Sequence, residues 1–456
     1  MKIHSSTWQM FLKRAWLFTA ALLLLVQLPL HATVVIEAWK TENGVRVYFV
    51  QTHAIPILDI GVDFDAGSRF DSRNRAGLAA MTNMLLTSGI AAANRPLREP
   101  AVTEAGISDA FANIGARHSV YANSDRAGVR LRTLSDREVS DRAVATLARM
   151  LAHPSFPEKL FQRDKKRAIS AIKEALTQPD AIVSREFMEV LYTEHPYAFS
   201  PTPESLASIR RSDMVAFHAT HYVADKAVIS IVGDATRERA EEVAEELSRR
   251  LNRSEDGRKS AELPAVEPSA VRERFIRHPS VQSHILIGMP SMERGDPDFF
   301  AITVGNYILG GGGFVSRLMQ EVREKRGLSY SVYSQFDPHI QKGPFIISLQ
   351  TQTEQTEEAV SVARETLETF MRDGPTQAEL DGAISHLVNG FPLNMDNNSK
   401  VLSLVSVIGF YGLPLDYLNS WQDRIREVRA EDIRGAFSRK LSPEGLSTVI
   451  VGQKKE

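Results

Sequence analysis

Residues 227–233, AVISIVG, and residues 447–453, STVIVGQ, are two short, apolar runs that reach a glycine. Runs of this length that are bounded by turn residues are typical of strands buried on both faces. The two runs lie about 220 residues apart, and each closes a segment with the same order of predicted elements, as expected for an internal repeat.

Each segment is predicted to contain a strand, a helix, a second strand and two further helices before its closing strand. In the first segment we place these elements at 58–68, 76–89, 127–134, 136–150 and 157–176. In the second we place them at 284–290, 297–310, 344–351, 354–373 and 376–389. The repetition predicts two duplicated α+β domains. The alternative is a chance similarity between two unrelated halves of α/β type.

Composition limits the class of protein. A chain of 456 residues exceeds what one hydrophobic core usually organises, so two domains or more are expected. With 43% hydrophobic and 24% charged residues it has the composition of a folded protein. A net charge of −2 argues against binding to nucleic acid by phosphate neutralisation. The absence of cysteine excludes disulfides, cysteine-bound zinc and a thiol nucleophile.

Residues 1–32 have the pattern of a secretory signal peptide. Lys2, Lys13 and Arg14 precede an apolar run over 15–30, and Ala32 is a small residue at a plausible cleavage site. We therefore expect export to the periplasm. Anchoring in the inner membrane by an uncleaved segment is the alternative, although the run is shorter than the ~20 residues that a spanning helix prefers. The mature chain is expected to contain no membrane span.

A polar stretch over 252–268 separates the two repeats and is typical of a linker. The predicted organisation is a signal peptide (1–32), an N-terminal domain (33–251), this linker, and a C-terminal domain (269–456).

Several short motifs follow one another in an order that identifies a family. They are Asn43-Gly44-Val45, Ala66-Gly67-Ser68-Arg69-Phe70-Asp71, Ala76-Gly77-Leu78-Ala79, Gly115-Ala116, His195-Pro196-Tyr197, Thr202-Pro203-Glu204-Ser205-Leu206, Val232-Gly233-Asp234, Gly310-Gly311-Gly312, Ser316-Arg317-Leu318 and the run VREKRGLSY over 322–330. Across the whole mature chain the sequence resembles the pitrilysin/insulinase family of zinc metallopeptidases in its two-domain form. The resemblance implies two duplicated pitrilysin-like domains of the LuxS/metallohydrolase type, each a mostly antiparallel sheet covered by helices.

The zinc site of active family members has no counterpart in this sequence. Their helix carries H-x-x-E-H, in which two histidines bind zinc and the glutamate is the general base, and a later helix supplies a third ligand. The corresponding residues here are Ala80, Asn83 and Met84, with Ala171 at the later position. A methyl group, an uncharged amide and a thioether are poor zinc ligands, and an amide is no general base. No metal is therefore expected in this chain, and Ala80 and Met84 are expected to join a buried apolar helix face.

Arg323 and Tyr330 match an arginine and a tyrosine that active members place in the second domain. The resemblance implies that the tyrosine donates to the oxyanion of the tetrahedral intermediate and that the arginine binds substrate carbonyl groups, which suits both side chains chemically. Without the family, the same residues would be a surface arginine and the first tyrosine of a strand.

Three further features have less specific interpretations. His218 and His221 are expected to be a solvated pair on one helix rather than a metal site. The glycines over 310–313 favour a flexible turn over a phosphate cradle, because no Lys-Ser/Thr follows. The family resemblance implies that the strand after Gly115 pairs with extended peptide, but Ser119 and Val120 depart from the usual Asn-Ala there.

Together these features predict a non-catalytic subunit of an exported heterodimeric zinc metallopeptidase. The chain would be inactive alone, would bind peptide or unfolded polypeptide, and would supply Arg323 and Tyr330 to a homologous partner that carries the zinc. A purely structural pseudopeptidase is the alternative, and an active peptidase in its own right is disfavoured by the motif.

Overall fold

The computed structural model describes residues 34–92, 99–254 and 263–454. The predicted signal peptide lies outside these residues, and Val35 begins a compact unit that extends to the C-terminus. Among the described residues, none of the helices is long and apolar enough to cross a membrane.

The first half forms a six-stranded sheet in the order β1-β2-β8-β3-β7-β6. Its strands are β1 (Glu37–Lys40), β2 (Arg46–Gln51), β3 (Ile57–Phe64), β6 (Arg117–Ala122), β7 (Ala127–Leu134) and β8 (Ala227–Gly233). Neighbours are antiparallel except β2 and β8, which are parallel. Every residue of β8 is buried, as the apolar run over 227–233 predicts. A separate two-stranded ribbon pairs β4 (Gly89–Ile90) with β5 (Val102–Thr103).

The second half repeats this topology in a five-stranded sheet, in the order β11-β12-β10-β13-β9. Its strands are β9 (Glu273–Arg277), β10 (Gln282–Met292), β11 (Ser329–Phe336), β12 (Gly343–Gln352) and β13 (Ser447–Gly452). The single parallel pair, β13 with β9, corresponds to β8 with β2. The predicted α+β fold with two mostly antiparallel sheets is confirmed.

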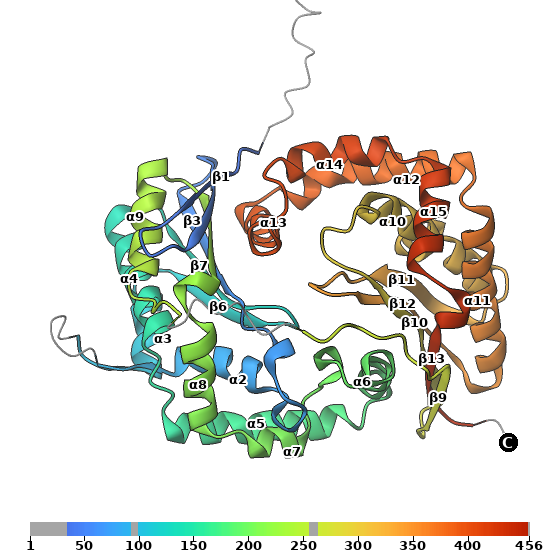
Figure 1. The fold of residues 1–456 in the computed structure, drawn as a ribbon, viewed down its shortest axis with the longest axis horizontal. Helices are drawn as coiled ribbons and strands as arrows, with labels where there is room; N and C mark the ends of the chain where they lie inside the picture. Colours follow the sequence, from blue (N-terminus) through green and yellow to red (C-terminus); the bar gives the residue numbers. More distant parts are fainter. Residues whose placement is uncertain (1–33, 93–98, 255–262, 455–456) are drawn as a thin grey trace, which may run out of the picture. The chain divides into compact units, whose positions relative to one another are not determined.

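Helices cover the sheets in both halves (Figure 1). The first half contributes α2 (Leu78–Met84), α3 (Glu104–Ala112), α4 (Arg137–Ala152), α5 (Glu158–Ala175), α6 (Pro179–Tyr192), α7 (Pro203–Ser208), α8 (Arg211–His221) and α9 (Arg237–Ser248). The second half contributes α10 (Phe299–Asn306), α11 (Thr356–Asp373), α12 (Gln377–Gly390), α13 (Asn398–Tyr411), α14 (Tyr417–Arg426) and α15 (Ala430–Lys440). Two π-helical segments, Tyr307–Gly311 and Met319–Glu324, flank a 3₁₀ turn at Gly313–Val315.

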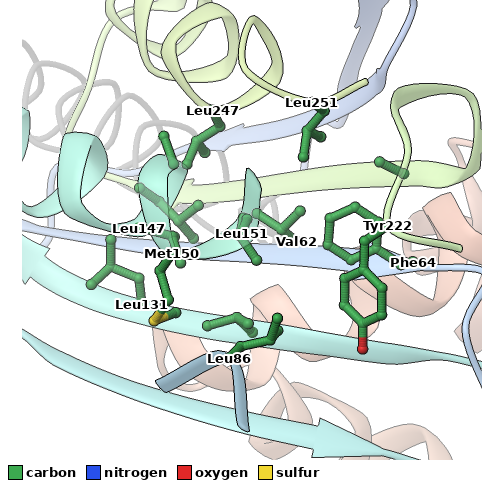
Figure 2. Packing of buried hydrophobic residues seen from close by; sticks show 14 of the residues in the cluster. Val62, Phe64, Leu86, Leu131, Leu147, Met150, Leu151, Tyr222, Leu247 and Leu251 are labelled. Carbon is green, nitrogen blue, oxygen red and sulfur yellow. The ribbon is translucent and has the colours of Figure 1, made fainter. Parts of the chain in front are cut away.

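The core of the first half forms where α4 and α9 lie on the sheet (Figure 2). Val62 of β3 and Leu131 of β7 face Leu147 and Leu151 of α4, while Leu247 comes from α9. Removing each such side chain from water stabilises the fold by about 1.5–3 kcal/mol. The alternation of apolar residues along β3 and β7 therefore fixes which face of the sheet the helices cover.

One helix from each half packs on the sheet of the other half. Helix α6 packs on β10 and β13, and helix α13 packs on β2, β3 and β8. The approach is close, since a Cβ atom on Gly288 of β10 would lie 3.1 Å from the ring of Phe187, and one on Gly409 of α13 would lie 2.6 Å from that of Tyr48. The division into domains at 33–251 and 269–456 stays a prediction, because the exchanged helices make one compact unit of both sheets.

Candidate functional site

The N-terminus of α2, the helix that aligns with the zinc helix of the family, is fixed by a buried carboxyl group. The Oδ2 and Oδ1 atoms of Asp71 accept hydrogen bonds from the backbone N–H groups of Gly77 (2.8 Å) and Ala79 (2.9 Å). Burial raises the pKa of Asp71 to about 7, although these backbone bonds favour the charged form. Asp71 thus positions the helix whether or not the helix carries a metal motif.

Asn83, at the position of the general base, is a structural cross-link. Its side chain is 1% exposed, and its Nδ2 donates to the carbonyl oxygens of Tyr121 (2.7 Å) and Gly128 (3.2 Å). Its Oδ1 accepts a bond from the hydroxyl of Tyr222 (3.0 Å), which is itself buried. The amide therefore ties α2 to strands β6 and β7 and to the chain after α8.

The other degenerate zinc positions lie at the surface. Ala80 and Ala171 are exposed, and Met84 is 39% exposed. The expectation that Ala80 and Met84 join the buried face of α2 is therefore wrong. The short helix packs against β6, β7 and α8 through other positions, among them Leu78 and Met81, and leaves positions 80 and 84 on the outer side.

The residues at this site do not fit a zinc ion. Two methyl groups and one thioether offer no nitrogen or oxygen ligand, and the one amide present has both of its groups engaged in hydrogen bonds. Elsewhere in the described parts of the chain, no group of three or more His, Asp or Glu side chains is placed to hold a metal.

The histidine pair of α8 is structural rather than solvated. The Nε2 of His218 donates to the carbonyl of Leu151 (2.8 Å), and the Nδ1 of His221 donates to the carbonyl of Asp65 (2.9 Å). Burial lowers the pKa of each imidazole to about 4, because desolvation disfavours the charged ring. The prediction that these two residues are solvated is wrong, since each ring instead fixes α8 to the rest of the first half.

Arg323 and Tyr330 lie together on the second half. The guanidinium carbon of Arg323 is 4.8 Å from the centre of the Tyr330 ring and 4.6 Å from that of Phe314. Tyr330 is 84% exposed and Phe314 is 63% exposed. Arg323 is the penultimate residue of the π-helical segment Met319–Glu324, and Tyr330 follows the first residue of β11, so adjacent elements hold the pair.

Sequence reasoning missed Phe314. A lone phenylalanine after a run of glycines has no periodicity that distinguishes it from an ordinary loop residue. The glycines before it are not a loose turn, because a Cβ atom on Gly310 would lie 2.4 Å from the backbone nitrogen of Ser334 in β11. The close approach keeps the helix end on the strand and places Phe314 beside Arg323.

The strand proposed to pair with peptide is an edge strand. β6 pairs with β7 alone in the described sheet, so its other side is available for strand addition. Ser119 and Val120 lie within β6, where Ser119 is exposed and Val120 is half-buried. Peptide docking at this edge stays a prediction.

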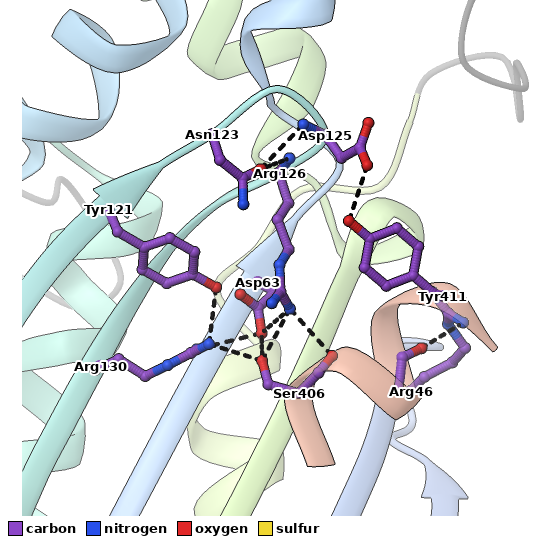
Figure 3. Close-up of polar contacts among 10 residues, drawn as sticks. Arg46, Asp63, Tyr121, Asn123, Asp125, Arg126, Arg130, Ser406 and Tyr411 are labelled. Carbon is purple, nitrogen blue, oxygen red and sulfur yellow. Dashed lines mark hydrogen bonds and ion pairs between the residues drawn. The ribbon is translucent and has the colours of Figure 1, made fainter. Parts of the chain in front are cut away.

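A buried polar cluster joins the two halves (Figure 3). Asp63 of β3 is fully buried and lies 3.2 Å from Arg130 and 3.5 Å from Arg126. Ser406 of α13 donates to the carboxylate of Asp63 and accepts from Arg126 (3.1 Å) and Arg130 (2.7 Å). One serine of the exchanged helix thus hydrogen-bonds to three charged groups of the first half.

A second carboxylate completes this junction. Asp125, fully buried in the turn between β6 and β7, accepts from the hydroxyls of Tyr197 (2.9 Å) and Tyr411 (2.8 Å) and from the backbone N–H of Ile340 (2.9 Å). Burial and the charge of Asp125 raise the pKa of both phenols. Tyr197, from the His195-Pro196-Tyr197 motif, therefore helps to connect the two halves through its hydrogen bond to Asp125.

The fold and site define a class: a two-domain peptidase-like protein with a degenerate zinc helix in one half and an aromatic–arginine cluster in the other. The chain belongs to the M16 (insulinase) family of peptidases. The family model described as "Insulinase (Peptidase family M16)" matches residues 46–201, and the model described as "Peptidase M16 inactive domain" matches residues 208–387. The resemblance drawn from the motifs is confirmed.

Three similar proteins cover most of the chain. The Non-peptidase homolog YmxG of Helicobacter pylori is 25% identical over 449 residues, which are 96% of this chain and 99% of that protein. The crystal structure of a peptidase M16 inactive domain from Pseudomonas fluorescens is 33% identical with a TM-score of 0.86, over 92% of this chain and 98% of that one. The periplasmic protease PqqL from Escherichia coli shares the fold at 14% identity, with a TM-score of 0.75 over 92% of this chain and 46% of that chain.

Proposed function

We propose that this protein is a non-catalytic subunit of an exported, heterodimeric M16 peptidase. In this proposal it binds peptide substrate and presents Arg323 and Tyr330 to the zinc site of a homologous partner subunit. The single observation that carries the proposal is the contrast between a zinc helix without usable ligands and an arginine whose guanidinium is held between two aromatic rings.

The chemistry of the pair suits substrate binding. A phenol hydroxyl can donate to an oxyanion as charge develops on it, and a guanidinium is a permanent, forked donor for carbonyl oxygens. Because Tyr330 is 84% exposed, its hydroxyl is free to reach an atom of another molecule. The zinc and the general base would come from the partner, so this chain alone is expected to be inactive.

Two comparisons support parts of the proposal. The relative from Helicobacter pylori is named a non-peptidase homolog, which agrees with the loss of the zinc ligands at Ala80, Met84 and Ala171 and of the general base at Asn83. The protease from Escherichia coli that shares the fold is described as periplasmic, which agrees with the signal-like pattern of residues 1–32. A structural pseudopeptidase with no role in proteolysis is the alternative.

The test is reconstitution. The chain is purified alone and together with an M16 homologue from the same organism that carries H-x-x-E-H, and cleavage of an unstructured peptide is measured. Activity is expected only from the pair, and Tyr330→Phe is expected to lower kcat of the pair by roughly 10²-fold or more.

Tyr333→Phe is the matched control, because Tyr333 lies on the same strand and is 46% exposed. It should leave the rate unchanged. An unaltered rate with Tyr330→Phe would leave only the structural alternative, and stoichiometric zinc in the isolated chain, measured by elemental analysis, would contradict the assignment as a zinc-free subunit.

A further inference from the structure

Arg323 is an arginine without a polar partner. In the described parts of the chain its guanidinium makes no hydrogen bond and no ion pair, and it lies over the rings of Phe314 and Tyr330. Some other arginines of the second half are paired, such as Arg317 with Glu379 (2.7 Å) and Arg439 with Asp298 (2.6 Å), whereas Arg424, like Arg323, lies over a ring, that of Phe300 (5.2 Å). Arg323 therefore retains all its N–H donors for a group outside the chain.

Carboxylates are nevertheless close to Arg323 in the sequence. Glu321 lies two residues earlier and pairs with Lys325 and Arg326. Glu324 is adjacent and exposed. An unrestrained arginine on this segment would be expected to form transient ion pairs with these carboxylates. The faces of the two rings offer the guanidinium an alternative position that competes with those ion pairs.

Phe314 is held at its place by a closed turn. It is the central residue of the 3₁₀ segment Gly313–Val315, which begins at a positive φ of 61° on Gly313. The backbone N–H and the hydroxyl of Ser316 both bond to the carbonyl of Gly313 (3.0 and 2.7 Å), and Ser316 is fully buried. The backbone turn that carries the exposed ring is therefore held by hydrogen bonds.

We infer that Phe314 is a positioning residue for Arg323: its ring and that of Tyr330 clamp the guanidinium, keep it away from neighbouring carboxylates and aim its donors at a peptide carbonyl. This inference rests on the proposed function of Arg323 and Tyr330. Two rings restrict the guanidinium before substrate arrives, so less conformational entropy is lost when the peptide binds.

The experiment compares side chains at position 314 in the reconstituted pair with the H-x-x-E-H homologue. Phe314→Ala should lower kcat/KM about fivefold or more, because one of the two cation–π contacts is lost. Phe314→Tyr should retain the rate within about twofold, since it keeps the ring face. Phe314→Leu keeps apolar bulk without that face and should behave like Phe314→Ala.

Val315→Ala is the matched control, because Val315 is the next residue and is also 63% exposed. It should leave kcat/KM unchanged. A double-mutant cycle provides a readout that a merely structural role would not give: Phe314→Ala combined with Arg323→Ala should be no slower than Arg323→Ala alone. The same order of variants is expected for binding of a fluorescein-labelled unstructured peptide to the isolated chain.

The two proposals fail in different ways. If Arg323→Ala and Tyr330→Phe leave the pair unaffected, the proposed function is overturned and this inference with it. If those two variants are impaired but Phe314→Ala matches Val315→Ala, or if its effect multiplies with that of Arg323→Ala, only the role of Phe314 is overturned. Equal rates for Phe314→Leu and wild type would show that apolar packing at position 314 is sufficient without a cation–π contact, which would also contradict the inference.

Discussion

Asn83 of the first half and Arg323 of the second half lie at positions that carry catalytic or substrate-binding residues in active family members. Their polar groups are used in opposite ways. Asn83 is 1% exposed, and both its N–H and carbonyl groups are used within the first half. Arg323 is half-buried and lies over two aromatic rings, and its guanidinium makes no hydrogen bond or ion pair with the described residues. The first arrangement stabilises the fold, whereas the second leaves donors available for binding.

The largest effect is expected at Asp63, a fully buried carboxylate of the first half that pairs with two arginines. Asp63→Ala would leave the buried Arg126 and the half-buried Arg130 without their carboxylate, and breaking a buried ion pair typically lowers the free energy of unfolding by about 3–5 kcal/mol. Urea denaturation of the purified chain measures this change. Ser406→Ala removes only the hydroxyl of the same cluster and should cost about 1–2 kcal/mol; equal costs would show that the charges do not dominate the junction.

The next test restores the acid at the base position. Asn83→Glu would place a carboxylate beside the carbonyl oxygens of Tyr121 and Gly128, which now accept from Asn83. We expect a loss of about 2–4 kcal/mol in the free energy of unfolding, because the buried charge would face two carbonyl oxygens and would keep the hydroxyl of Tyr222 as its donor.

Ala80→Glu on the same helix is the control, since Ala80 is exposed. It should change the free energy of unfolding by no more than about 0.5 kcal/mol. If Asn83→Glu is tolerated equally well, Asn83 does not hold the structure in the way its contacts indicate, and the contrast with Arg323 weakens.

The sequence predicts the strands and their order in each half well, because each strand is encoded within a few neighbouring residues. The role of Arg323 and Tyr330, which the family resemblance implies, stays a prediction. Alternating apolar residues define β3 and β7, and continuous apolar runs define β8 and β13. The short run from 322 to 330 carries both members of the pair. Local patterns of this kind survive in the structure because burial and strand geometry act at short range.

What the sequence does not reveal depends on distant partners. The bond between Asn83 and Tyr222 joins residues 139 positions apart, and nothing near Asn83 indicates it. Likewise, the amphipathic pattern of α6 or α13 shows that one face is buried but not which sheet covers it. The exposed position of Met84 follows from the packing of α2 and could not be read from its apolar side chain.

A smaller effect, which depends on pH, tests the histidines of the first half. Because burial lowers the pKa of His218 and His221 to about 4, below an unfolded value near 6.5, the folded protein binds fewer protons than the unfolded one. Their contribution is complete above pH 6.5 and is lost as the pH falls towards 4. We expect a loss of roughly 2–3 kcal/mol per histidine over this range.

Urea denaturation at intervals between pH 7 and 4 measures the slope. Replacing each histidine by glutamine keeps an N–H donor without a titrating ring, so the double variant should lose much of the acid sensitivity in this interval. A slope that persists in the double variant would assign the acid sensitivity to other groups.

The smallest effect on stability is expected at the second half's free arginine. Arg323→Ala removes two cation–π contacts at a partly exposed site and should change the free energy of unfolding by no more than about 1 kcal/mol. Arg317→Ala is the comparison within the same half, because it breaks a bidentate pair with Glu379 and a bond to the carbonyl of Gly374 (2.9 Å). Hydrogen bonds to charged groups are typically worth about 1.5–3 kcal/mol, so Arg317→Ala should destabilise more. An equal loss for the two variants would mean that Arg323 supports the fold as Arg317 does, and its free donors would then no longer distinguish a binding residue from a structural one.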